Sequence, residues 1–126
     1  MCIEVLTRSL SEIENIDSPR IGYRVMNRCK SGGYSSIMHD TVRLLRKGNK
    51  YKAIIHYSVT PLYIGGWYMF DDPRDAYKYM QILRLLLTDL VLLKVECWNV
   101  CAEGLQFDFP VFCALDMSIL EEIPKG

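Results

Sequence analysis

Apolar and polar residues alternate along much of this chain, and a period of two is the spacing of a β-strand. Within residues 21–28, Ile21, Tyr23 and Val25 share one face, whereas Arg24 and Arg28 lie on the other. Similar patterns predict further strands at residues 34–38, 51–57, 62–70, 91–97, 105–109 and 111–120. We therefore expect a mainly antiparallel sheet of five to seven strands.

One stretch has the spacing of a helix instead. Asp72 is a good N-cap residue, Pro73 suits the first helical position, and Asp75 favours the positive end of the helix dipole. Apolar residues then recur three or four positions apart from Ala76 to Leu87. The sequence predicts one principal helix, from Pro73 to about Leu87, packed on the sheet in an α+β fold.

The first residues show a weaker pattern, with apolar side chains at helical spacing: Ile3, Leu6, Leu10 and Ile13. This pattern predicts either a short helix or a loosely attached arm, which Ser18-Pro19 ends. We find no linker or repeat beyond this point. We expect an arm or short helix at residues 1–20 and a single α+β domain at residues 21–126.

Glycines mark where the chain should turn. Ser31-Gly32-Gly33 predicts a hairpin turn, and residues 101–104 predict a turn between two late strands. Gly65-Gly66 lies inside a predicted aromatic strand, where it indicates a bulge or a close approach of two backbones.

The formal net charge is +0, and half of the residues are hydrophobic. This composition is typical of a globular chain and argues against general affinity for nucleic acid or acidic membranes. Because no net charge keeps copies apart, we expect a homo-oligomer.

Several features predict a cytoplasmic protein that does not enter the membrane. The longest apolar run, residues 82–93, contains Arg84 and Asp89 and falls short of the ~20 residues that a span needs. The acidic residues near the start are unlike a secretory signal. Five cysteines without an export signal favour free thiols.

The residue types of catalytic and metal sites do not form a recognisable set. Cys97 and Cys101 would lie about 13 Å apart on one strand, which is too far to share a metal ion. The two histidines, His39 and His56, have no motif with a nucleophilic serine or cysteine beside them. We expect a non-enzymatic protein with no metal and no cofactor.

The first half of the chain instead combines arginines with aromatic residues, and this combination binds nucleobase and phosphate together. Two arginines on one strand face can hold a phosphate through paired hydrogen bonds. Most surface arginines only favour solubility, and most rings of a small sheet pack in its core. The candidate ligand-binding residues are Arg24, Arg28, Tyr34, Ser36, His56, Trp67 and Arg74.

Five sequence elements follow one another: Gly22-Tyr23-Arg24-Val25, a Gly-Gly-Tyr-Ser turn, Gly66-Trp67-Tyr68-Met69-Phe70, an Asp-x-x-Asp-Ala-x-x-Tyr helix start and a Val-Leu-Leu-Lys-Val-Glu strand. Over residues 21–123 this order resembles small phage-encoded domains, and among them the Thoeris anti-defence sponge proteins. The resemblance implies a non-enzymatic, oligomeric protein in the host cytoplasm. Such a protein would sequester a cyclic nucleotide or a cyclic ADP-ribose-type signal of bacterial immunity.

Two other functions stay open. A protein-interaction module, or an inhibitor of a host protein, would show a large exposed apolar patch, for example at residues 1–13 or beside Trp98. An NAD-linked transferase or a nucleotide-cleaving enzyme is the second alternative. It rests on Arg24, residues 58–60 and Glu96 or Glu121, which are similar to the Arg/Ser-Thr-Ser/Glu pattern of one class of ADP-ribosyltransferases.

Overall fold

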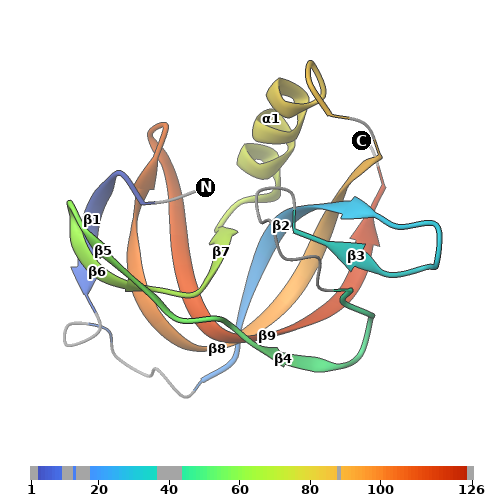
Figure 1. Cartoon of the computed structure of the whole chain (residues 1–126). Coiled ribbons are helices and arrows are strands. Elements are labelled where there is room, and N and C mark those ends of the chain that lie inside the picture. The colour runs from blue at the N-terminus through green and yellow to red at the C-terminus, as the bar shows by residue number, and fades with distance from the viewer. Residues whose placement is uncertain (1–2, 10–12, 14–17, 37–43, 88, 125–126) are drawn as a thin grey trace.

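Antiparallel strands dominate the computed structural model, which describes residues 3–9, 13, 18–36, 44–87 and 89–124 (Figure 1). These residues form one helix and nine strands, seven of them in one sheet and two in a second. A mostly antiparallel sheet with one helix agrees with the predicted α+β class. The predicted strand count was too low, because two expected strands are each divided and residues 5–9 form a further strand, whereas residues 105–109 are shared between two long strands.

The larger sheet contains β1 (Val5–Ser9), β2 (Arg20–Arg28), β3 (Tyr34–Ser35), β4 (Lys50–Lys52), β7 (Trp67–Phe70), β8 (Leu90–Gln106) and β9 (Phe109–Ile123). Its order is β1-β8-β2-β7-β9-β4, with β3 beside β2 and with β8 also paired to β9. The pairings of β8, β2, β7 and β9 therefore close a ring. The smaller sheet is a hairpin of β5 (His56–Val59) and β6 (Leu62–Gly65).

The two divided strands explain why the hairpin stands apart from the larger sheet. The expected strand at residues 51–57 becomes β4 and β5, and the one at residues 62–70 becomes β6 and β7. The second division falls at Gly66, where an added Cβ would lie 2.4 Å from the carbonyl oxygen of Ala114. The close backbone approach predicted at Gly65-Gly66 is confirmed.

β8 and β9 form one long hairpin, and the turn predicted at residues 101–104 is wrong. β8 continues to Gln106, because a β-bulge between Val100 and Ala102 takes up an extra residue without ending the strand. The chain turns instead at Phe107 and Asp108, whose positive φ angles of 50° and 65° fit a two-residue hairpin turn.

The helix α1 (Pro73–Leu83) begins where the sequence predicts it. The Asp72 side chain accepts a hydrogen bond from the Arg74 amide, and Pro73 is the first helical residue. Ala76, Tyr79 and Met80 are buried against the sheet. The helix ends four residues before the predicted Leu87, because the Leu85 and Leu86 amides bond to carbonyls three residues back, as in a turn, and the chain then leaves for β8.

The N-terminal segment does not form the predicted short helix where it is described. Val5–Ser9 form β1 instead, which pairs antiparallel with β8. Pairing with the free edge of a long strand overrides the weak helical spacing. The predicted division at residue 20 stays a prediction.

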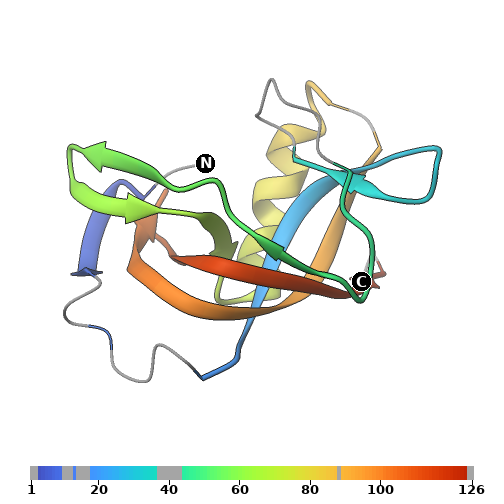
Figure 2. The ribbon, with the colours of Figure 1, turned by 60° about the horizontal axis from the view of Figure 1, so that its bottom comes forward.

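Two buried clusters lie on the two faces of the larger sheet. One includes Val25, Phe70 and Tyr79 and is covered by α1, whereas the other includes Met26 and Trp67. Figure 2 shows α1 on one side of the curved β8 and β9 ribbons and β4 along their edge. No helix in the described parts of the chain is long and apolar enough to cross a membrane.

Candidate anion-binding site

Three arginines, Arg20, Arg24 and Arg28, follow one face of β2 at intervals of four residues. Side chains an even number of positions apart point to the same side of a strand. The three arginines nevertheless have different surroundings, and these differences identify the candidate site.

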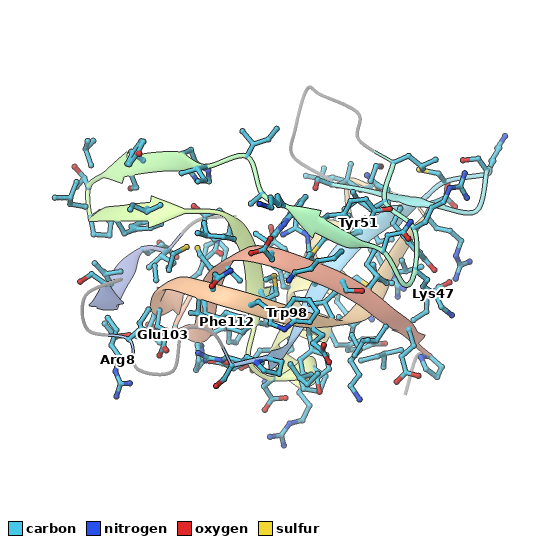
Figure 3. The ribbon with its side chains drawn as sticks, turned by 90° about the horizontal axis from the view of Figure 1, so that it is seen from below. Arg8, Lys47, Tyr51, Trp98, Glu103 and Phe112 are labelled. Atoms are coloured by element: carbon cyan, nitrogen blue, oxygen red, sulfur yellow. The ribbon has the colours of Figure 1, made fainter. Side chains whose placement is uncertain are left out.

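Arg20 is matched by two carboxylates. Its guanidinium lies 2.7 Å from the Asp71 carboxylate and 2.9 Å from that of Glu103. It also lies over the Phe112 ring, 4.1 Å from the ring centroid. Glu103 and Phe112 are cross-strand neighbours of β8 and β9, and Figure 3 shows them side by side. The charge of Arg20 is therefore compensated within the fold.

Arg28 is matched by one carboxylate. It forms an ion pair with Glu122 of β9, and the Tyr34 hydroxyl donates a second hydrogen bond of 2.8 Å to the same carboxylate. The hydrogen bond from Arg28 holds the pKa of Glu122 below its usual range. Burial, followed by the bond to Glu122, raises the pKa of Tyr34.

Arg24 has only neutral partners among the described residues. Its guanidinium donates hydrogen bonds of 2.8 Å to the Tyr68 carbonyl and 3.0 Å to the Ser36 hydroxyl, and lies 5.3 Å from the Trp67 ring centroid. Its Nε is fully enclosed and has no hydrogen-bond partner. Burial lowers the pKa of Arg24 to about 10, so the group stays cationic at neutral pH.

The ring of strands explains why Arg24 lies here. β2 and β7 pair only at Tyr23 and Phe70, and β2 then continues along β8. Tyr68 lies two residues before Phe70, and its carbonyl is within reach of β2. The Arg24 guanidinium donates a hydrogen bond to this carbonyl. It places a positive charge in a partly buried site where no described residue supplies a compensating negative charge.

The predicted ligand-binding residues therefore separate into groups. Arg24, Ser36 and Trp67 lie together, and Arg28 and Tyr34 meet at Glu122. Sequence reasoning missed two partners, the Tyr68 carbonyl and Glu122. A backbone carbonyl leaves no signal in the sequence, and Glu122 is 94 positions from Arg28.

His56 lies apart from both groups. Its Nε2 is 2.7 Å from the Tyr68 hydroxyl, which in turn is 3.0 Å from the Tyr63 hydroxyl. The Tyr63 hydroxyl accepts a hydrogen bond of 3.0 Å from the Ile3 amide. This chain of hydrogen bonds fastens the β5–β6 hairpin to the body of the protein, so we assign His56 a structural contact here.

Arg74 is also apart from the cluster around Arg24. It is exposed at the start of α1, where its guanidinium lies 2.9 Å from the Asp72 carboxylate. This arrangement supports the helix cap and provides an arginine with which Arg24 can be compared experimentally.

A groove of about 740 Å³ lies between the end of α1 and the ends of β8 and β9. Its described lining is aliphatic and charged, without an aromatic ring: Arg28, Met80, Arg84, Leu87, Asp89, Leu90, Val91, Leu92, Glu122, Ile123 and Pro124. Only Arg28 of the predicted site residues lines it. The two acidic groups beside Arg28 and Arg84 make the groove a poorer anion site than Arg24.

Other chemistry is not assembled in the part of the chain that the structure describes. No three His, Cys, Asp or Glu side chains gather there as a metal site, and the four described cysteines are free thiols. Of the residues of the transferase alternative, Arg24 contacts Tyr68 and Ser36, whereas Ser58 lies in the smaller sheet. His39 lies outside the described residues.

The comparisons with known proteins add no assignment. A scan against protein-family models and searches of curated proteins and solved structures give no significant match.

Proposed function

We propose that this protein binds a small anionic ligand at Arg24 and does not transform it chemically. One observation carries the proposal: Arg20 and Arg28 are each matched by carboxylates, whereas the enclosed Arg24 has only neutral partners among the described residues. A cation removed from water without a counter-charge is unfavourable. An anion from solution would supply the missing charge.

The chemistry of the site favours a phosphate-bearing ligand. A planar guanidinium forms charge-assisted hydrogen bonds with phosphate oxygens, and the neighbouring Ser36 hydroxyl can donate another. Ser36 and Arg24 retain some exposed surface, so the outer end of the guanidinium is where an anion would approach. The Trp67 ring is buried and covers the cation; it is not an open platform for a base.

Cyclic nucleotides and cyclic ADP-ribose-type signals are the first ligands to test. They carry phosphates, and the resemblance to sponge proteins implies ligands of this class. In that role the protein would lower the free concentration of a signal by holding it, in support of phage counter-defence.

The test is a binding screen by calorimetry and thermal unfolding. The probes are cyclic ADP-ribose isomers, cyclic di- and trinucleotides and inorganic phosphate. A probe present at about 100 times its Kd should raise the free energy of unfolding by about 2.7 kcal/mol. Arg24→Met should weaken binding at least tenfold, since a hydrogen bond to a charged group contributes about 1.5–3 kcal/mol.

Arg74→Met is the matched control, because this arginine is exposed and paired with Asp72. It should leave the affinity unchanged, and chromatography should recover the ligand intact. The proposal is overturned if no probe binds at millimolar concentration, or if Arg24→Met and wild type bind equally. Chemical conversion of a probe into a product would overturn the proposal that the protein is not an enzyme.

A further inference from the structure

The β5–β6 hairpin carries an exposed apolar face that no other described strand or helix covers. Its cross-strand pairs are Tyr57 with Ile64 and Val59 with Leu62, and these four residues form the hairpin face. Tyr57, Val59 and Leu62 are 75%, 80% and 72% exposed. Ile54 and Ile55, just before β5, are also exposed. A contiguous apolar surface of this kind marks an interaction site.

The hairpin is held in place from its other side. Tyr63 is buried, and its hydroxyl bonds to the Ile3 amide and lies beside the Tyr68 hydroxyl. The His56 ring lies over Gly65, where an added Cβ would come within 2.3 Å of it. Figures 1 and 2 both show the hairpin at the end of the molecule where β1 lies. The hairpin face is therefore presented outward by specific contacts.

Nothing in the sequence of the hairpin protects this face. Residues 53–70 contain no Asp, Glu, Lys or Arg. Exposed strands usually carry charges that prevent pairing with other chains, and a two-stranded sheet alone is marginally stable in water. In the described structure the hairpin pairs with no third strand. We therefore expect a binding partner to cover the hairpin face.

We propose that the hairpin face of one copy packs against the hairpin face of a second copy, which gives a two-fold symmetric dimer. A second copy brings an apolar surface of the same size and shape, as a self-complementary interface requires. The formal net charge of +0 gives little long-range repulsion between copies. A membrane surface is a poorer occupant, because residues 53–70 provide no Lys or Arg for anionic lipids.

The area is adequate for a reversible dimer. At 150–250 Å² for a large side chain, the exposed parts of Tyr57, Val59 and Leu62 present roughly 450 Å² on each copy, and the exposed Ile54 and Ile55 just before β5 add to the apolar surface. Standard stable interfaces bury about 800 Å² on each partner. The dimer is therefore expected to dissociate on dilution rather than to be permanent.

The test is sedimentation velocity on the full chain between about 1 and 200 μM, a range that brackets a micromolar Kd. Wild type should shift from monomer to dimer across it. Val59→Lys should remain monomeric, because it would bury an unpaired ammonium group on each side of the interface. The control is Leu86→Lys, at an equally exposed leucine beyond α1, which should still dimerise. Circular dichroism should show that both variants are folded.

A charge-swap mixture makes the test specific to the hairpin face. Val59→Glu should also be monomeric, and an equimolar mixture with Val59→Lys should form mixed dimers through opposite charges. A monomeric wild type at 200 μM overturns the proposal, as does a dimer that survives Val59→Lys or a mixture that stays monomeric. A monomeric wild type that sediments with phosphatidylcholine–phosphatidylglycerol vesicles would instead assign the face to a membrane.

Discussion

Arg24 and its neighbours Arg20 and Arg28 are the same residue type on the same face of one strand, yet their side chains have different partners. The two outer arginines form ion pairs with Asp71, Glu103 and Glu122. The middle one is enclosed by a carbonyl, a hydroxyl and an indole ring. The presence or absence of an acidic partner among the described residues thus separates the two arginines that are charge-compensated within the fold from the one at which we propose that an anion binds.

This difference has an energetic meaning. Ion pairs compensate the charge of an arginine whether or not a ligand is present. An enclosed cation with neutral partners keeps part of its desolvation penalty until an anion arrives. Sites that bind ligands often retain such a penalty at the expense of stability. Substitution of each arginine by methionine, which has similar length and no charge, tests the comparison directly.

The largest effect on stability is expected at Arg20. Arg20→Met should lower the free energy of unfolding by about 1–2 kcal/mol, because the partly buried Glu103 and the exposed Asp71 both lose their partner. Urea denaturation of the ligand-free protein measures this loss. Arg20→Lys should restore only part of it, since one ammonium group cannot reproduce the forked geometry. An unfolding free energy equal to that of wild type would show that these ion pairs do not support the fold.

Arg24→Met, unlike Arg20→Met, should not lower the free energy of unfolding. Without ligand, its free energy of unfolding should equal that of wild type or exceed it by about 1 kcal/mol, because an uncompensated cation is replaced by an apolar side chain. The same urea experiment measures it. A saturating ligand should reverse the order, since only wild type gains from binding. A loss greater than about 1 kcal/mol would instead identify Arg24 as a structural donor to the Tyr68 carbonyl.

The parts of this fold that local chemistry governs could be predicted from the sequence. Alternation placed Arg24 and Arg28 on one face of β2, and the Asp72-Pro73 cap located the start of α1. Gly66 was identified because a backbone approach excludes any side chain there. Each of these signals lies within a few residues of its consequence.

Features that depend on distant partners could not be predicted. The carboxylate that matches Arg28 is 94 positions away, and the carbonyl beside Arg24 is 44 positions away. β1 forms because it meets the edge of β8. The turn at Phe107 and Asp108 has positive φ angles without a glycine, so the glycine-containing segment at residues 101–104 was mistaken for it. Tertiary pairing outweighs local preference in each case.

The smallest predicted effect is on the pH dependence of stability, and it tests whether Glu122 compensates the charge of Arg28. Because Arg28 holds the pKa of Glu122 below its usual value, the folded protein keeps this carboxylate ionised where the unfolded chain binds a proton. The resulting stabilisation is fully present above the ordinary glutamate pKa of about 4.3 and disappears as the pH falls through the lowered value. Wild type should therefore lose stability on acidification slightly more steeply than Glu122→Gln.

Urea denaturation between about pH 5 and pH 3 measures this slope. Because Arg28 is well exposed, 1 M salt should largely remove the difference. Glu121→Gln is the control, since it changes the same residue type at the adjacent position, on the opposite face of β9. If Glu122→Gln and wild type share one slope, the ion pair has no influence in solution. Arg28 would then be as unmatched as Arg24, and anion binding would have to be tested at both.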